Sequence, residues 1–157
     1  MVKVDVSQII DGIGAVQPFS VVTDAQEIGE SEPWVQGDIA VTGQIANVGA
    51  SFRLTAEVVA RAPMECSRCL KAFEQPVKFR FEEDLESAVI GFGNDWIDIA
   101  EGIRAALIFQ DPMQSLCDEA CKGICFRCGA DLNQVDCGCD RTVVDPRLAA
   151  LGKLLEK

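Results

Sequence analysis

Eight cysteines and the absence of histidine constrain this chain more than any other feature of its sequence. Six of the cysteines fall between Cys117 and Cys139, and the other two, Cys66 and Cys69, form a C-x2-C pair upstream. Cysteines at such close spacings are typical of disulfide frameworks and of metal sites. Either arrangement would tie distant parts of the backbone together and so decide much of the fold around it.

The composition favours metal over disulfides. Apolar residues make up 48% of the 157 residues, enough for a hydrophobic core that needs no disulfides. The opening MVKVDVSQII lacks the basic start and long apolar run of a signal peptide, and no apolar run reaches the roughly twenty residues of a membrane span. We therefore expect a cytoplasmic protein without membrane contact, in which reducing conditions favour zinc. An iron–sulfur cluster is disfavoured because the ferredoxin C-x2-C-x2-C run is absent.

The spacing of the cysteines predicts two Zn²⁺ ions, each bound by four thiolates. Cys125 and Cys128 form a C-x2-C turn followed by Gly129, which is typical of a zinc knuckle, and Cys137 and Cys139 supply a second close pair. The remaining four cysteines would form the other site: Cys66, Cys69, Cys117 and Cys121. The alternative is one cluster shared by the six C-terminal cysteines, with the upstream pair left free.

Alternating apolar and polar residues predict a β-rich N-terminal half. Val2, Val4 and Val6 indicate a short, half-buried strand. From residue 34 to about residue 83 the alternation recurs, which predicts an antiparallel sheet with one solvated face. We expect Gly43 to break one of these strands.

Helical signals lie in the C-terminal half. Glycines in residues 87–95 predict a linker. Asp98 and Glu101 fit a capping box for a helix that Pro112 ends. A proline at residue 146, followed by a stripe of leucines, indicates a second, C-terminal helix.

Together these patterns predict an α+β protein. We expect a β-rich antiparallel domain over residues 1–86 that carries the first C-x2-C knuckle. Residues 96–157 would hold a helix, a Cys-rich zinc-binding segment at 113–145 and the C-terminal helix, packed on the same domain.

The net charge of −11 limits the partners that this chain can bind. Eight thiolates around two Zn²⁺ would lower it further, to about −15. Such a chain repels nucleic acid unless its cations are concentrated. Five of its fourteen cations flank the first C-x2-C pair: Arg61, Arg68, Lys71, Lys78 and Arg80. We expect these five to form an RNA-binding face; the alternative is ordinary solvated charge.

Catalytic motifs are missing. Without histidine the chain has no Ser-His-Asp or Cys-His pair, and its glycines lack the G-x-G-x-x-G spacing of a dinucleotide site. Cys66 and Cys69 lie between predicted strands, whereas a thioredoxin-type redox pair opens a helix. We therefore expect no enzymatic activity and no small-molecule substrate.

Several stretches carry a family resemblance: VDVSQII, MECSRCLKAFEQPV, DPMQSLCDEACKGICFRCGADLN with the following CGC, and DPRLAALGKLLEK. They resemble the bacterial YceD-type large ribosomal RNA subunit accumulation proteins. The resemblance implies a cytosolic, non-enzymatic factor for the production or processing of large-subunit ribosomal RNA. We expect such a factor to bind RNA or a ribosomal protein. The alternative is a thiol-based protein that responds to redox state or to metal.

Overall fold

The computed structural model describes residues 1–29, 34–86, 95–140 and 147. Its contacts divide the chain into two compact units. The sheet unit comprises Met1–Met64 and Ala72–Met113. The cysteine unit comprises Glu65–Lys71 and Gln114–Lys157, so the first C-x2-C pair belongs to it together with the C-terminal cysteines.

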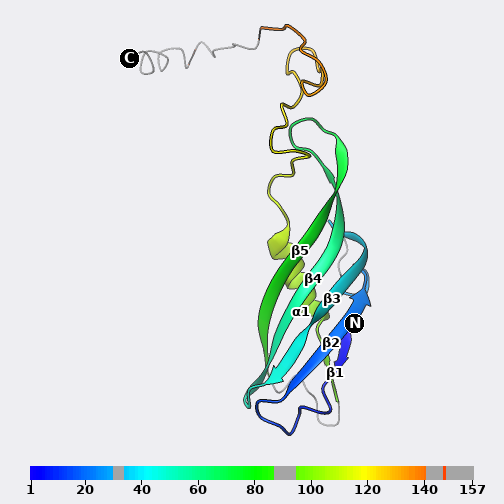
Figure 1. Cartoon of the computed structure of the whole chain (residues 1–157), viewed down its shortest axis with the longest axis vertical. Coiled ribbons are helices and arrows are strands. Elements are labelled where there is room, and N and C mark those ends of the chain that lie inside the picture. The colour runs from blue at the N-terminus through cyan, green and yellow to red at the C-terminus, as the bar shows by residue number, and fades with distance from the viewer. Residues whose placement is uncertain (30–33, 87–94, 141–146, 148–157) are drawn as a thin grey trace. The chain divides into compact units, whose positions relative to one another are not determined.

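Two sheets form most of the sheet unit, and Figure 1 shows the larger one. It has four strands in the order β2-β3-β4-β5, and both β2–β3 and β3–β4 pair antiparallel. The smaller sheet pairs β1 and β6, also antiparallel. The strands are β1 (Lys3–Asp5), β2 (Val16–Thr23), β3 (Gln36–Asn47), β4 (Ser51–Glu65), β5 (Ala72–Glu86) and β6 (Trp96–Asp98). The expected antiparallel, β-rich architecture is confirmed.

The core follows the predicted alternation. Val2, Val4 and Val6 are all buried, as expected for the short first strand. In β4 every second residue from Phe52 to Ala62 is buried, while Arg53 and the other alternate residues are wholly or partly exposed. One face of the sheet therefore packs into a hydrophobic core and the other meets solvent.

Gly43 does not break its strand, contrary to our expectation. It lies within β3 and pairs with Phe19 of β2 on one side and with Ala56 of β4 on the other. A Cβ added to Gly43 would collide with the backbone oxygen of Thr55 and lie 2.8 Å from the Cα of Ala56. The glycine thus permits a close approach of β3 and β4 rather than a turn.

The predicted helix is present as α1 (Ala100–Gln110), which adds buried residues to the same core. The predicted capping box of Asp98 and Glu101 is not formed. The Asp98 carboxylate accepts hydrogen bonds from the backbone N–H groups of Ala100 (3.0 Å) and Val2 (2.9 Å), so it joins the helix start to the N-terminal strand. Glu101 instead pairs with Arg104 at 3.0 Å.

Two expected segments fall outside the described residues. These are the linker at residues 87–95, apart from Asp95, and the C-terminal helix beyond residue 145, apart from Arg147. Among the described residues no helix is long and apolar enough to cross a membrane.

Candidate metal centre

The first C-x2-C pair forms a tight turn. The backbone N–H of Cys66 donates to the carbonyl oxygen of Lys71, and the N–H of Leu70 donates back to the carbonyl of Cys66, both at 2.9 Å. Leu70 closes the turn with a φ of 59°, in the left-handed region. This turn directs the side chains of Cys66 and Cys69 toward the same side, as a zinc knuckle requires.

The second C-x2-C pair repeats this geometry. The N–H of Cys125 donates to the carbonyl of Ala130, and the N–H of Gly129 donates to the carbonyl of Cys125, both at 2.8 Å. Gly129 has a φ of 73°. It therefore holds the position that Leu70 holds in the first knuckle, with the residue type that takes this conformation without strain.

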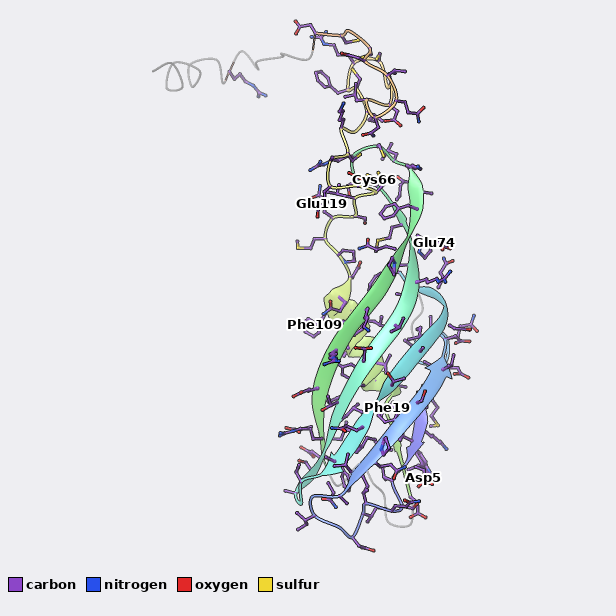
Figure 2. The ribbon with its side chains drawn as sticks, viewed as in Figure 1. Asp5, Phe19, Cys66, Glu74, Phe109 and Glu119 are labelled. Atoms are coloured by element: carbon purple, nitrogen blue, oxygen red, sulfur yellow. The ribbon has the colours of Figure 1, made fainter. Side chains whose placement is uncertain are left out.

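The structure brings all eight cysteines into two sets of four, both within the cysteine unit. In each set the sulfurs all lie within 4.8 Å of one another. The first set is Cys66, Cys69, Cys117 and Cys121, and the second is Cys125, Cys128, Cys137 and Cys139. These are the sets that the spacing predicts. Figure 2 labels Cys66 of the first set.

The sulfur separations in the first set fit a metal ion rather than disulfides. The Sγ atoms of Cys66 and Cys121 lie 3.8 Å apart, and those of Cys69 and Cys117 lie 3.6 Å apart. Four sulfurs placed tetrahedrally at a Zn–S distance of about 2.3 Å lie about 3.8 Å from one another. A disulfide would need about 2.05 Å. Four thiolates are also the ligands of closed structural zinc sites, so both sets can hold such an ion.

The thiols of the first set differ in how readily they ionise. The pKa of the Cys66 thiol lies at about 6, below its ordinary 9.0, because the backbone N–H of Cys117 hydrogen-bonds to its sulfur and stabilises the thiolate. The pKa of the Cys117 thiol is raised to about 12 because its sulfur is hydrogen-bonded to that of Cys69, and because burial disfavours the charge.

The second set repeats the division. Backbone N–H groups of Cys128 and Arg127 lower the pKa of the Cys125 thiol to about 6. The neighbouring sulfurs of Cys128 and Cys137 raise the pKa of the Cys139 thiol to about 12. In each set, backbone N–H groups help one sulfur to ionise, whereas hydrogen bonds between the sulfurs and repulsion by neighbouring thiolates keep another protonated. A divalent cation would remove that repulsion and release the remaining protons.

Asn133 supports the first set, and the sequence analysis missed it. Its side-chain N–H donates to the Sγ of Cys121 at 3.4 Å, and its carbonyl oxygen accepts the backbone N–H of Lys122 at 2.8 Å. The Asp131 carboxylate accepts a hydrogen bond of 2.8 Å from the side-chain amide of Asn133 and so orients that amide. The short spacing of Asp131 and Asn133, typical of an Asx turn, was the only sequence signal.

Arg68 has a structural role that we did not expect. Its guanidinium donates to the backbone carbonyls of Cys121 (2.9 Å) and Glu119 (3.4 Å). Its own carbonyl accepts the N–H of Ile124 at 3.1 Å. Gly123 makes room for this contact, because an added Cβ would lie 2.9 Å from the Arg68 oxygen. Arg68 thus fastens the first knuckle to the segment that leads into the second. Figure 2 labels Glu119, which belongs to this segment.

The other expected RNA-binding residues are divided between the two units. Lys71 lies in the cysteine unit. In the sheet unit, Lys78 and Arg80 project from β5 and share one carboxylate, Glu57 of β4, at 2.9 and 3.2 Å. Arg61 lies 3.9 Å from the carboxylate of Glu74. The structure thus brings Lys78 and Arg80 together. Arg61, Lys78 and Arg80 all form ion pairs with glutamates.

The described residues define an antiparallel β-sheet protein with a cysteine-rich unit whose two sets of four cysteines could each hold a metal ion. A family model described as large ribosomal RNA subunit accumulation protein YceD matches residues 54–155. The match covers well over half of the chain and includes all eight cysteines, so the protein belongs to this family.

A curated relative agrees with this membership. It is the large ribosomal RNA subunit accumulation protein YCED homolog 1, chloroplastic, of Arabidopsis thaliana, and it is 41% identical over 61 residues. The match covers 39% of this chain but only 19% of the relative. No solved structure matches this chain.

Proposed function

We propose that this protein is a non-enzymatic factor in the accumulation or processing of large-subunit ribosomal RNA. It works in the cytoplasm by binding RNA or a ribosomal protein. The observation that carries this proposal is the family match over residues 54–155, because it spans both sets of cysteines. The lack of histidine throughout the chain supports a binding role over a catalytic one.

In this proposal the cysteine unit holds two Zn²⁺ ions, one in each set. Zinc bound by four thiolates has no open position for a substrate, so it supplies stability rather than chemistry. Each ion fixes a knuckle against a second pair of cysteines, and in the first set that pair comes from a distant part of the chain. The unit then presents a rigid surface to its partner.

Removal of the protein from its host tests the function. We expect large-subunit ribosomal RNA to fall relative to small-subunit RNA, and the wild-type gene to restore the ratio. A variant with Ser at Cys66 and Cys69 should restore it only in part, because the first set would lose its metal. A ratio that stays unchanged after removal would contradict the proposed function.

A second candidate function is a thiol-based response to redox state or to metal supply, and the exposure of Cys128 favours it. Although its knuckle partner Cys125 is buried, Cys128 itself is a ligand of the second set that is open to oxidants and chelators. Zinc counting during alkylation separates the two functions. Two retained ions with unreactive thiols support the binding factor, whereas rapid release from the second set supports the responsive protein.

A further inference from the structure

We propose that two copies of this protein associate through α1, with the two helices packed antiparallel. The contact surface is the exposed side of α1 together with Met113, just beyond the end of the helix. A twofold axis would relate the copies, so each contributes the same residues. This inference goes beyond the proposed function and does not depend on it.

The exposed side of α1 is apolar toward its C-terminal end. Ala105, Ile108 and Phe109 are all exposed, and their spacing of three and four residues places them on one side of the helix. Ile108 is 56% exposed and Phe109 is 88% exposed, and Met113 is fully exposed. Figure 2 labels Phe109. Large apolar side chains that gather on a surface in this way mark a protein contact.

The opposite side of α1 already packs on the sheet unit. Ile103 and Leu107 are buried in the core, and the indole N–H of Trp34 donates to the carbonyl oxygen of Leu107 at 3.2 Å. A helix that is apolar on both sides is normally buried between two layers. The core of the sheet unit supplies one of these layers, and the second copy would supply the other.

The distribution of charge favours a second copy as the occupant. The chain carries a net charge of −11, so two copies repel each other over much of their surface. Residues 104–113 are an exception, because their only charges are those of Arg104 and Asp111, which cancel. Repulsion between copies is therefore low where the apolar side chains lie. A strongly basic partner would instead be attracted to the acidic remainder of the molecule.

The order of residues along α1 suits an antiparallel copy. Arg104 lies in the first half of the helix and Asp111 at its C-terminal end. Two antiparallel helices that cross near Leu107 place the Arg104 of each copy beside the Asp111 of the other. The same crossing places each Phe109 against the small Ala105, as in helices whose ridges fit into grooves. A parallel pair would instead bring the two Asp111 carboxylates together, which repel each other.

The C-terminal end of α1 gains a cation in this arrangement. Its last turn has no basic residue, although the partial negative charge at the end of a helix attracts cations. Arg104 pairs with Glu101 of its own helix at 3.0 Å, and its side chain is still 37% exposed. In the antiparallel pair, the Arg104 of each copy would neutralise the negative end of the other helix.

Sedimentation of the zinc-loaded full chain tests the proposal. The chain is studied from about 5 to about 500 μM at physiological salt, with a reducing agent that prevents disulfides between copies. We expect the mass to rise from that of one chain toward that of two. The dissociation constant should be on the order of 10 μM, because a helix of 11 residues offers less area than the roughly 800 Å² per partner of a stable interface.

Two variants locate the contact. F109S removes the largest side chain of the surface, and should raise the dissociation constant about tenfold or more. Because Phe109 lies outside the core, zinc content and circular dichroism should be retained. V22S is the matched control, since Val22 of β2 is an apolar residue that is 65% exposed on the sheet. It should associate as the wild type does.

Reversal of two charges tests the antiparallel orientation. D111K and R104E should each weaken association several-fold, because each places like charges together across the contact. The double variant R104E/D111K restores opposite charges and should regain most of the affinity that R104E loses. The ion pair with Glu101 is lost in both R104E and the double variant, so it cancels in this comparison.

Three results would overturn the proposal. A chain that sediments as a single copy at every concentration would leave the apolar surface to a different protein. Association that F109S does not weaken would place the contact elsewhere on the molecule. A double variant that associates no better than R104E would refute the antiparallel pairing.

Discussion

At the scale of single residues, the two knuckles place different residue types in one backbone conformation. Leu70 and Gly129 both have a positive φ, at 59° and 73°. Glycine adopts this region freely, whereas a side chain there costs about 1–2 kcal/mol. The equivalent positions should therefore respond in different ways to substitution.

Gly129→Ala should lower the free energy of unfolding of the zinc-loaded chain by about 1 kcal/mol, because alanine has to enter the strained region. Leu70→Gly should change it by less than about 1 kcal/mol, because the relief of strain offsets the greater freedom of glycine in the unfolded chain. Denaturant titration of both variants at saturating zinc measures the difference. A larger loss in Leu70→Gly than in Gly129→Ala would contradict the assignment.

Asn133 is the second residue to test at this scale. Asn133→Ala removes the donor to the Cys121 sulfur and the acceptor for the Lys122 N–H. Loss of such a partner of a metal ligand typically lowers affinity about 10–100-fold, and we expect this loss for one of the two zinc ions. Competition with a chelator measures it. Gln134→Ala, which removes only a hydrogen bond to Asp131, is the matched control and should retain both ions.

At the scale of elements, the first knuckle depends on a segment far along the chain. Its sulfurs meet those of Cys117 and Cys121, while the second knuckle takes its partners from the residues that follow it. The two sites therefore have different dependence on the rest of the fold. The first is closed only when two segments of the cysteine unit come together.

Replacement of Cys66 and Cys69 by Ser tests this arrangement. Zinc content should fall from about two ions per chain to about one, because a tetrahedral site does not survive the loss of two of its four ligands. Cys117 and Cys121 should then react with an alkylating agent, and mass spectrometry locates the modification. Replacement of Cys137 and Cys139 by Ser should instead make Cys125 and Cys128 reactive to the alkylating agent. Unchanged zinc in the first variant would favour a cluster of the six C-terminal cysteines.

At the scale of the whole molecule, the two units are stabilised by different means. The sheet unit has a continuous hydrophobic core made by its strands and α1. Among its described residues, the cysteine unit contributes only cysteines to the buried apolar residues: Cys66, Cys121 and Cys125. Metal ions rather than apolar burial should therefore hold the cysteine unit together.

Removal of zinc should unfold the cysteine unit and leave the sheet unit folded. Structural zinc contributes on the order of 10–16 kcal/mol in small peptides, comparable to the stability of a whole domain. Amide exchange in residues 65–71 and 114–140 should accelerate strongly after chelation, while β3 and β4 stay protected. Unchanged exchange in the cysteine unit after complete removal would show that the metal is not structural.

RNA binding by the whole molecule, if it occurs through the expected basic face, should be weak. Lys78 and Arg80 already share Glu57, so a phosphate has to compete with this carboxylate. Replacement of Arg61, Lys78 and Arg80 by Gln should lower RNA affinity and flatten the salt slope by about two units, at about 0.7 per lost contact on a single strand. Arg53→Gln is the control, because Arg53 lies on the same sheet and is also paired, with Asp84, but is outside the expected basic face. Wild-type binding without salt dependence would identify these cations as ordinary surface.

The sequence by itself determined the local features of this protein. The period of two predicts the buried face of β4, because alternate residues of a strand point to opposite sides. The spacing of Cys125, Cys128, Cys137 and Cys139 predicts one set of sulfurs, because all four ligands are near in sequence. The other set followed from it, as the four cysteines that remained.

Only the tertiary structure decided the features that depend on partners distant in sequence. Gly43 stays in its strand because two neighbouring strands pair with it, and Asp98 serves the N-terminal strand as well as α1. Arg68 donates hydrogen bonds to backbone carbonyls some fifty residues away. The Cys66 sulfur likewise lies next to the sulfur of the distant Cys121. Local preferences act through a residue's immediate neighbours, whereas these contacts depend on the path of the whole chain, which brings their partners together only when it has folded.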